Sequence, residues 1–289
     1  MWLWNKGEIM EKLLIIDGSN LLFQMFFGMP ARIVNNQGKA IQGTLGFVGA
    51  MLKIIRKVEP SHMFVVFDGE HENERCDLDS EYKANRIDYS TVGEEENPFS
   101  QLQDVYNALD YLGIKHIETT DCEADDLIAS YALSFGQQME IIISSFDSDF
   151  FQLITNNVSV LRYRGEKTVI CTPEYVMDKF GIVPEQYADF KSLVGDAADN
   201  IKGAEKVGVK TAAMLLEELG TLENIIANVD NIKKTSVKES IIRNAEKLRL
   251  NYLIIKLGEY KLLPVSKQEL EYCYAGITTN EVLKGIGLR

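Results

Sequence analysis

The stretch "KLLIID", residues 12–17, is a short apolar run that ends in an aspartate. Two later stretches, "HMFVVFD" at 62–68 and "EIIISSFD" at 140–147, repeat this pattern. Runs of this length are typical of buried strands, and the segments between them have the periodicity of helices. The alternation predicts an α/β fold with a mostly parallel central sheet and helices on both of its faces.

The second part of the sequence has a different pattern. From about residue 173 the apolar runs become rare and helical periodicity dominates, as in "PEQYADFKSLVG" and "KTAAMLLEELG". We therefore expect an α/β domain over residues 11–184 and a helical domain over residues 185–289, with the boundary near Pro184.

The composition limits the class of protein. With 46% hydrophobic and 25% charged residues among 289, the chain is typical of a soluble globular protein. The four cysteines lie far apart and form no C-x-x-C pair, which argues against a zinc site or a disulfide framework. The sequence shows no secretory leader and no apolar run near the ~20 residues of a membrane span. We expect a cytoplasmic monomer without a membrane segment, in which residues 1–9 are a dispensable extension.

Aspartates follow the three predicted strands: Asp17, Asp68 and Asp147, with Asp149 two residues later. An aspartate before a glycine is usually only a turn residue. In an open parallel sheet, however, the carboxyl ends of the strands share one edge, where ligands bind, so these side chains should converge. Carboxylates packed this closely raise one another's pKa, and a cation is their simplest partner. Oxygen ligands favour Mg²⁺ or Mn²⁺ over Zn²⁺.

A second acidic cluster lies in "DCEADDLIAS", residues 121–130, at the start of a predicted helix over 123–136. Taken alone, it is most simply a helix start, because acidic side chains cap free N–H groups and complement the helix dipole. The helix should nevertheless pack at the same sheet edge as the strand-terminal aspartates. Its carboxylates therefore become candidates for the same cation site.

A third acidic motif, "GDAADNIKGAEKVGVKTAAMLL" at 195–216, joins two aspartates to a glycine-punctuated hairpin. The hairpin leads into a helix, whose N-terminal amides are suited to binding an anion. Such a connection is more often only a tight turn. Beside Asp196 and Asp199, and with lysines around it, it predicts a backbone-phosphate clamp next to a metal site. The lysines are Lys202, Lys206 and Lys210.

Together these motifs resemble the 5′ nucleases, which include the 5′-3′ exonuclease domain of bacterial DNA polymerase I, phage 5′ nucleases and flap endonucleases. The resemblance covers residues 11 to about 260 and rests on "LLIIDGSNLLF", "FVVFDG", "YKANR", "EADDLIA", "SSFDSDFFQL", "GDAADNI" and "VGVKTA". It implies a PIN-like nuclease core and a helical domain with a helix-hairpin-helix type motif at about 195–219. Because the sequence ends at Arg289, we expect a standalone nuclease without a polymerase module.

The resemblance also implies the ligands of two divalent metal ions, Mg²⁺ or Mn²⁺, and a monovalent cation at the hairpin. The ligands of one divalent ion would be Asp17, Asp68, Glu123, Asp125 and Asp126. The ligands of the other would be Asp147, Asp149, Asp196 and Asp199.

The segment at about 70–98 is long and polar for a connecting loop, and such loops tend to be functional or disordered. The resemblance implies an arch here, through which a single-stranded 5′ end passes. Arg75, Lys83 and Arg86 match basic arch positions, and Tyr82 is a candidate to stack on a base. With ten acidic and three basic residues, this arch is unusually negative.

The function that the resemblance implies is a structure-specific 5′-3′ exonuclease or flap endonuclease, which hydrolyses DNA at 5′ ends or flaps in primer removal and repair. Lys83 and Arg86 would neutralise charge on the phosphoryl oxygens. The net charge of −13 opposes phosphate binding, so metal ions and local basic residues must supply the attraction. The implied DNA contacts are Arg75, Tyr82, Lys83, Arg86, Lys202, Gly203, Lys206, Gly208, Lys210 and Thr211.

Three alternatives remain at this point. A branched-DNA-binding protein that has lost catalysis would share the fold, but all nine acidic positions are present here. A PIN-type single-stranded RNA nuclease would share the strand-end acids but lack the hairpin and the arch. A small-molecule phosphatase could use the "DSD" at 147–149, although that pattern lies late in the chain.

Overall fold

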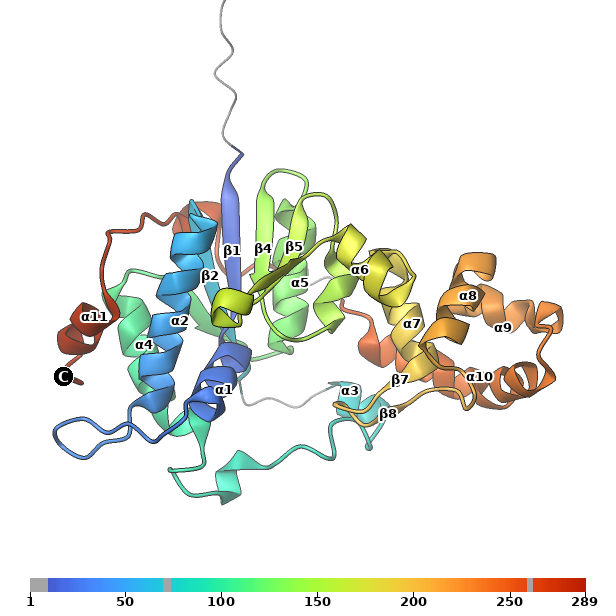
Figure 1. The fold of residues 1–289 in the computed structure, drawn as a ribbon, viewed down its shortest axis with the longest axis horizontal. Coiled ribbons are helices and arrows are strands. Elements are labelled where there is room, and N and C mark those ends of the chain that lie inside the picture. The colour runs from blue at the N-terminus through green and yellow to red at the C-terminus, as the bar shows by residue number, and fades with distance from the viewer. Residues whose placement is uncertain (1–9, 70–73, 259–261) are drawn as a thin grey trace, which may run out of the picture.

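The computed structural model describes residues 10–69, 74–258 and 262–289 and contains a central six-stranded sheet (Figure 1). The strand order is β3-β2-β1-β4-β5-β6. Neighbouring strands are parallel except for β6, which runs antiparallel to β5. The strands are β1 (Lys12–Asp17), β2 (His62–Phe67), β3 (His116–Glu118), β4 (Glu140–Ser144), β5 (Val158–Arg162) and β6 (Val169–Cys171).

Helices cover both faces of the sheet. In β1, Leu14 and Ile16 point into one apolar cluster, whereas Leu13 and Ile15 point into another, as the two-residue period of a strand requires. The first cluster lies under α1 (Gly18–Gly28), α2 (Gln42–Val58), α4 (Leu102–Tyr111) and α11 (Thr279–Gly285). The second lies under α5 (Ala124–Phe135) and the short 3-10 helix η3 (Asp149–Leu153). The predicted fold class is confirmed.

The helical part follows β6, as the sequence predicts. Its elements are α6 (Pro173–Phe180), α7 (Tyr187–Val194), β7 (Gly195–Asp196), β8 (Ile201–Lys202), α8 (Val209–Leu219), α9 (Leu222–Ala227) and α10 (Thr235–Ile255). The order α7, β7–β8 hairpin, α8 forms the helix-hairpin-helix type motif. Gly203 is required here by close packing, because a Cβ at this position would lie 2.3 Å from the carbonyl carbon of Val194.

The core beneath α5 continues into the helical part without a break. One cluster of buried side chains includes Ile143 of the sheet, Tyr187 of α7 and Leu216 of α8. Two buried carboxamides add polar links to α10: Gln152 donates to the carbonyl of Ile255 (3.1 Å), and Asn251 donates to that of Ser192 (3.2 Å). The helical part is therefore fixed against the sheet. The core runs across Pro184, so the domain boundary there stays a prediction.

The predicted arch is described from residue 74 onward; its residues 70–73, like residues 1–9, lie outside the described part of the chain. The arch begins with α3 (Glu74–Leu78), which lies near β7 and β8 in Figure 1, and then returns toward α4. Near its end, Tyr89 packs edge-on against Phe23 of α1, with ring centroids 5.1 Å apart. The arch is thus attached at one end to the helical part and at the other to α1.

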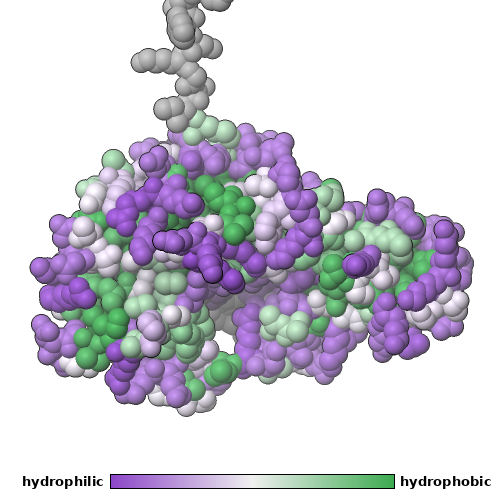
Figure 2. Space-filling view, in the orientation of Figure 1, coloured by the Kyte–Doolittle hydropathy of each residue, from purple (hydrophilic) through white to green (hydrophobic). Residues whose placement is uncertain are grey.

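The surface agrees with a globular chain. On the face in Figure 2, hydrophobic residues lie in separate patches among hydrophilic ones, as is usual for such proteins. Within the described residues, no helix is both long enough and apolar enough to cross a membrane.

Candidate active site

The strand ends bring Asp17 and Asp68 to one edge of the sheet. Asp17 ends β1, and its carboxylate accepts hydrogen bonds from the amide of Asn20 (3.0 Å) and the hydroxyl of Ser145 (2.8 Å). Asp68 follows β2 and accepts from the amide of Ala124 (2.9 Å), the first residue of α5. The start of α5 is therefore capped by a distant strand end, while Glu123 at its own N-cap position makes no capping bond.

Asp125 and Asp147 join these two carboxylates. Burial, followed by the charges of Asp68 and Asp147, raises the pKa of Asp17 to about 7. The pKa of Asp125 is raised well above its usual range by burial and by the charges of Asp147, Asp17 and Asp68. Mutual repulsion of this kind requires the carboxylates to be close, so the convergence expected at the sheet edge is present.

A second group of carboxylates lies between η3 and the β7–β8 hairpin. One oxygen each of Asp149, Asp196 and Asp199 lies within 4.8 Å of the others. Burial, followed by the charge of Asp147, raises the pKa of Asp149 to about 7. Its Oδ1 atom is buried and lies 3.0 Å from an ammonium nitrogen. An all-oxygen donor set of this kind fits a hard divalent cation.

That ammonium belongs to Lys191 of α7, which sequence reasoning missed. Lys191 is buried, with a side chain 8% exposed, and pairs with both Asp149 and Asp196. Burial opposes its charge, but the neighbouring carboxylates outweigh this and raise its pKa. The available signal was a lysine between Phe190 and Leu193 in an otherwise apolar helical pattern.

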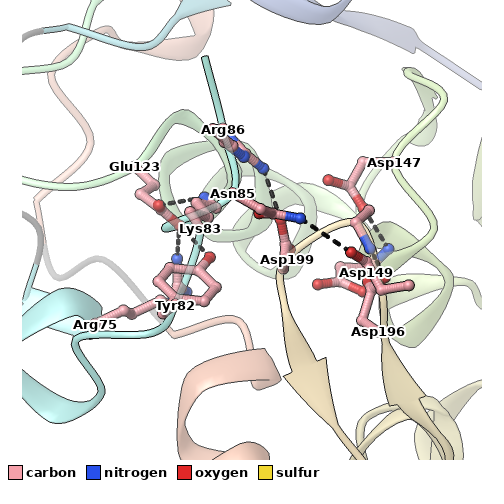
Figure 3. A network of polar contacts seen from close by, with 12 residues as sticks. Arg75, Tyr82, Lys83, Asn85, Arg86, Glu123, Asp147, Asp149, Asp196 and Asp199 are labelled. Atoms are coloured by element: carbon pink, nitrogen blue, oxygen red, sulfur yellow. Dashed lines mark hydrogen bonds and ion pairs between the residues drawn. The ribbon is translucent and has the colours of Figure 1, made fainter. Parts of the chain in front are cut away.

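The arch supplies the cations for the first group of carboxylates. Glu123 pairs with both Arg75 and Lys83, and Arg75 also reaches Asp126 at 2.8 Å. Asp126 accepts a further bond from the amide of Gly258 (3.0 Å), which follows α10. Figure 3 shows Arg75, Lys83 and Glu123 together on one side and Asp147, Asp149 and Asp196 on the other. Asp126 therefore links the arch, α5 and the helical part.

Tyr82 requires a correction. The resemblance makes it a candidate to stack on a base, but the residue is only 6% exposed and packs with Ile201 of the hairpin and Ile254 and Ile255 of α10. An apolar ring between two elements gains more from burial than from exposure to solvent. In this arrangement Tyr82 anchors the arch and offers no face to a nucleotide.

Arg86 and the hairpin residues complete the set of predicted DNA contacts. Arg86 pairs with Asp199 at 2.7 Å, and its side chain remains 55% exposed. Lys202, Lys206 and Lys210 are exposed around the start of α8, where a Cβ at Gly208 would meet no atom within 4 Å. Thr211 is in the first turn of α8. This leaves an accessible helix N-terminus with lysines around it.

Comparison with known families shows which family this arrangement represents. Residues 12–181 match the family "5′-3′ exonuclease, N-terminal resolvase-like domain", and residues 182–275 match "5′-3′ exonuclease, C-terminal SAM fold". The chain belongs to the 5′-3′ exonuclease family.

Curated proteins similar to this chain include DNA polymerases I. The chain is 35% identical to the thermostable DNA polymerase I of Thermus thermophilus over 241 residues, which cover 83% of this chain and 28% of the relative. It is 33% identical to DNA polymerase I of Streptococcus pneumoniae over 268 residues, or 91% of this chain and 30% of that one. The chain thus spans less than a third of the length of these relatives.

Solved structures agree in fold. Bacteriophage T5 5′-exonuclease with bound zinc ions has a TM-score of 0.71 at 24% identity, covering 86% of this chain and 90% of that one. The catalytic core of Rad2 in complex with DNA substrate has a TM-score of 0.59 at 15% identity, covering 96% and 93%. At these identities the likeness concerns the fold alone.

Proposed function

We propose that the protein is a metal-dependent 5′-3′ exonuclease and flap endonuclease that hydrolyses DNA phosphodiesters in primer removal and repair. The observation that carries this proposal is the convergence of carboxylates at one sheet edge beside an accessible helix-hairpin-helix motif. Family membership, a T5 flap endonuclease relative described with DNA and metal ions, and the Rad2 core described with DNA substrate support it.

The carboxylates would hold two divalent cations, Mg²⁺ or Mn²⁺, as the all-oxygen donor set favours. One group comprises Asp17, Asp68, Glu123, Asp125 and Asp126; the other comprises Asp147, Asp149, Asp196 and Asp199. When bound, such ions lower the pKa of water and stabilise charge on the scissile phosphate and the leaving oxygen. Because Asp126 is held by Arg75 and by the amide of Gly258, its share in this group would be indirect, through the orientation of α5.

The basic residues would act on the phosphate itself. Lys83 is paired with Glu123. A cation that occupies the carboxylates would replace Lys83 as the partner of Glu123, and the free ammonium would then turn to the phosphoryl oxygens. Arg86 is half exposed at Asp199 and would act beside it. The bond that breaks joins phosphorus to the 3′-oxygen, and the products would carry 5′-phosphates.

The helical part would hold duplex backbone, with phosphate facing the amides of α8 and with Lys206 and Lys210 adding charge. A monovalent cation at the hairpin belongs to the same proposal. The long helix α10 adds less attraction than its sequence suggests, because Arg243 and Arg249 are paired with neighbouring glutamates. Binding should therefore depend mainly on the hairpin.

The test compares cleavage of a 5′-flap DNA, a nicked duplex and single-stranded RNA with Mg²⁺, with Mn²⁺ and with excess EDTA. We expect cleavage of the flap and of the nicked duplex with either ion, and none with EDTA. Activity that persists in EDTA would contradict the metal-dependent mechanism. Exclusive cleavage of the RNA would favour a PIN-type nuclease, and binding without cleavage would indicate a branched-DNA-binding protein.

A further inference from the structure

One part of the arch is joined directly to the hairpin. Residues 81–86, here called the docked segment, lie against the hairpin turn, residues 197–200. The amide of Lys83 donates to the carbonyl of Asp199 (3.1 Å), and the carboxamide of Asn200 donates to the carbonyl of Glu81 (2.8 Å). The carboxamide of Asn85 donates to the carbonyl of Ala197 (3.3 Å). The position of Lys83 is thus set by main-chain contacts with the helical part.

The backbone conformations at this contact support a functional constraint. Lys83 has φ +54° and Asn200 has φ +58°, so both lie in the left-handed region without being glycine. Asparagine tolerates this region, whereas for lysine it is uncommon and persists only where the surroundings enforce it. The hydrogen bonds between the docked segment and the hairpin turn are the contacts that enforce it at Lys83.

We propose that Asn200 is a positioning residue for Lys83. Its carboxamide docks the segment on the hairpin turn and so fixes the point from which the Lys83 ammonium reaches the phosphate. Since the hairpin is also the proposed site of duplex binding, this contact would set where Lys83 stands relative to the bound duplex. The inference rests on the proposed function, because it assigns a role within that reaction.

The test uses Asn200→Gly, which tolerates the positive φ and removes only the carboxamide. We expect the single-turnover rate on a 5′ flap at saturating Mg²⁺ to fall about tenfold, the size of effect that loss of one hydrogen bond can have. The dissociation constant of the flap in metal-free buffer should change by less than about twofold. Asn228→Gly is the matched control: its carboxamide also donates to a main-chain carbonyl, that of Asn224 (2.9 Å), but it lies at the end of α9, so this variant should cleave at the wild-type rate.

A double-mutant cycle separates positioning from a general structural role. If Asn200 acts through Lys83, adding Asn200→Gly to Lys83→Ala should slow cleavage no further. The inference would be overturned if the rate decreases of the two single variants multiplied in the double variant, or if Asn200→Gly cleaved at the wild-type rate. If Asn200→Gly fails to fold, Asn85→Ala replaces it, because the Asn85 carboxamide joins the same two segments. We then expect the single-turnover rate to fall about threefold, and to fall no further when Asn85→Ala is added to Lys83→Ala. Failure of the proposed function is distinct, because the wild-type protein itself would then not cleave.

Discussion

The two groups of carboxylates in the site are neutralised in different ways. Glu123 receives Arg75 and Lys83 from the arch, whereas Asp149 and Asp196 receive Lys191 from inside helix α7. The arch cations come from a segment about 40 to 50 residues away in sequence, while Lys191 is five residues from Asp196 on the same helix-hairpin motif. We therefore propose that Lys191 serves the fold, whereas Lys83 is a partner of Glu123 that metal ions and substrate would replace.

The largest effect on cleavage should come from removing negative charge where the two groups of carboxylates meet. The double variant Asp147→Asn and Asp149→Asn should reduce cleavage by at least about 10³-fold, since oxygen ligands are lost at the centre of the site. Flap binding in metal-free buffer should stay equal or become tighter, because like-charge repulsion falls. Fluorescence anisotropy and single-turnover cleavage measure both. Asp230→Asn, at a side chain 90% exposed, is the control; much weaker binding of the double variant would show that the crevice does not repel DNA.

Replacing Lys191 tests whether its charge belongs to the fold. Lys191→Met should lower the free energy of unfolding by about 3–5 kcal/mol in metal-free buffer, because Asp149 and Asp196 lose a buried partner. Urea unfolding measures it, and added Mg²⁺ should restore part of the loss. Lys83→Met should cost only about 1 kcal/mol, since Glu123 keeps Arg75. Equal losses for the two variants would remove the distinction between the groups.

Replacing Lys83 tests the exchangeable partner. Lys83→Ala should reduce the single-turnover rate by about 10²-fold with little change in flap affinity, because the ammonium is proposed to stabilise the transition state more than the bound substrate. An unchanged rate would mean that Lys83 only neutralises Glu123.

The last prediction concerns the effect of pH on stability in the absence of metal. The pKa values of Asp17 and Asp149 are raised to about 7, chiefly by burial, so the folded state binds more protons than the unfolded state above pH 4. The stabilisation is fully present below the unfolded pKa and is lost as pH rises toward 7. We expect the free energy of unfolding to fall between pH 5 and pH 8, by about 1.4 kcal/mol for each pH unit over which one of these groups is protonated only in the folded state. Mg²⁺ should abolish this fall; stability that rises with pH without metal would contradict the burial of these groups.

The sheet and its acidic edge were predictable because they depend on local pattern. Apolar runs give the strands, and parallel strands place Asp17, Asp68 and Asp147 at one edge whatever the details of packing. In the cluster at 121–126, Glu123 makes no side-chain cap of α5, since Asp68 accepts the amide of Ala124 instead; a metal-binding role for the cluster stays a prediction.

What the sequence could not provide are contacts between distant segments. The burial of Tyr82 depends on α10, more than 150 residues later, and nothing in "YKANR" reports it. Lys191 looked like an ordinary helix residue because its carboxylate partners come from η3 and the hairpin. Pairings of this kind are set by tertiary packing, which periodicity does not record.

Helix α7 has a further consequence for how the sequence can vary. It leads directly into the hairpin and places Lys191 among the carboxylates. Its length therefore fixes both the direction in which the hairpin leaves the helix and the direction in which the Lys191 side chain points. Inserting or deleting one residue between Lys191 and Gly195 would turn one end about 100° relative to the other. Exchange of hairpins between relatives should therefore succeed only when α7 is transferred with the hairpin.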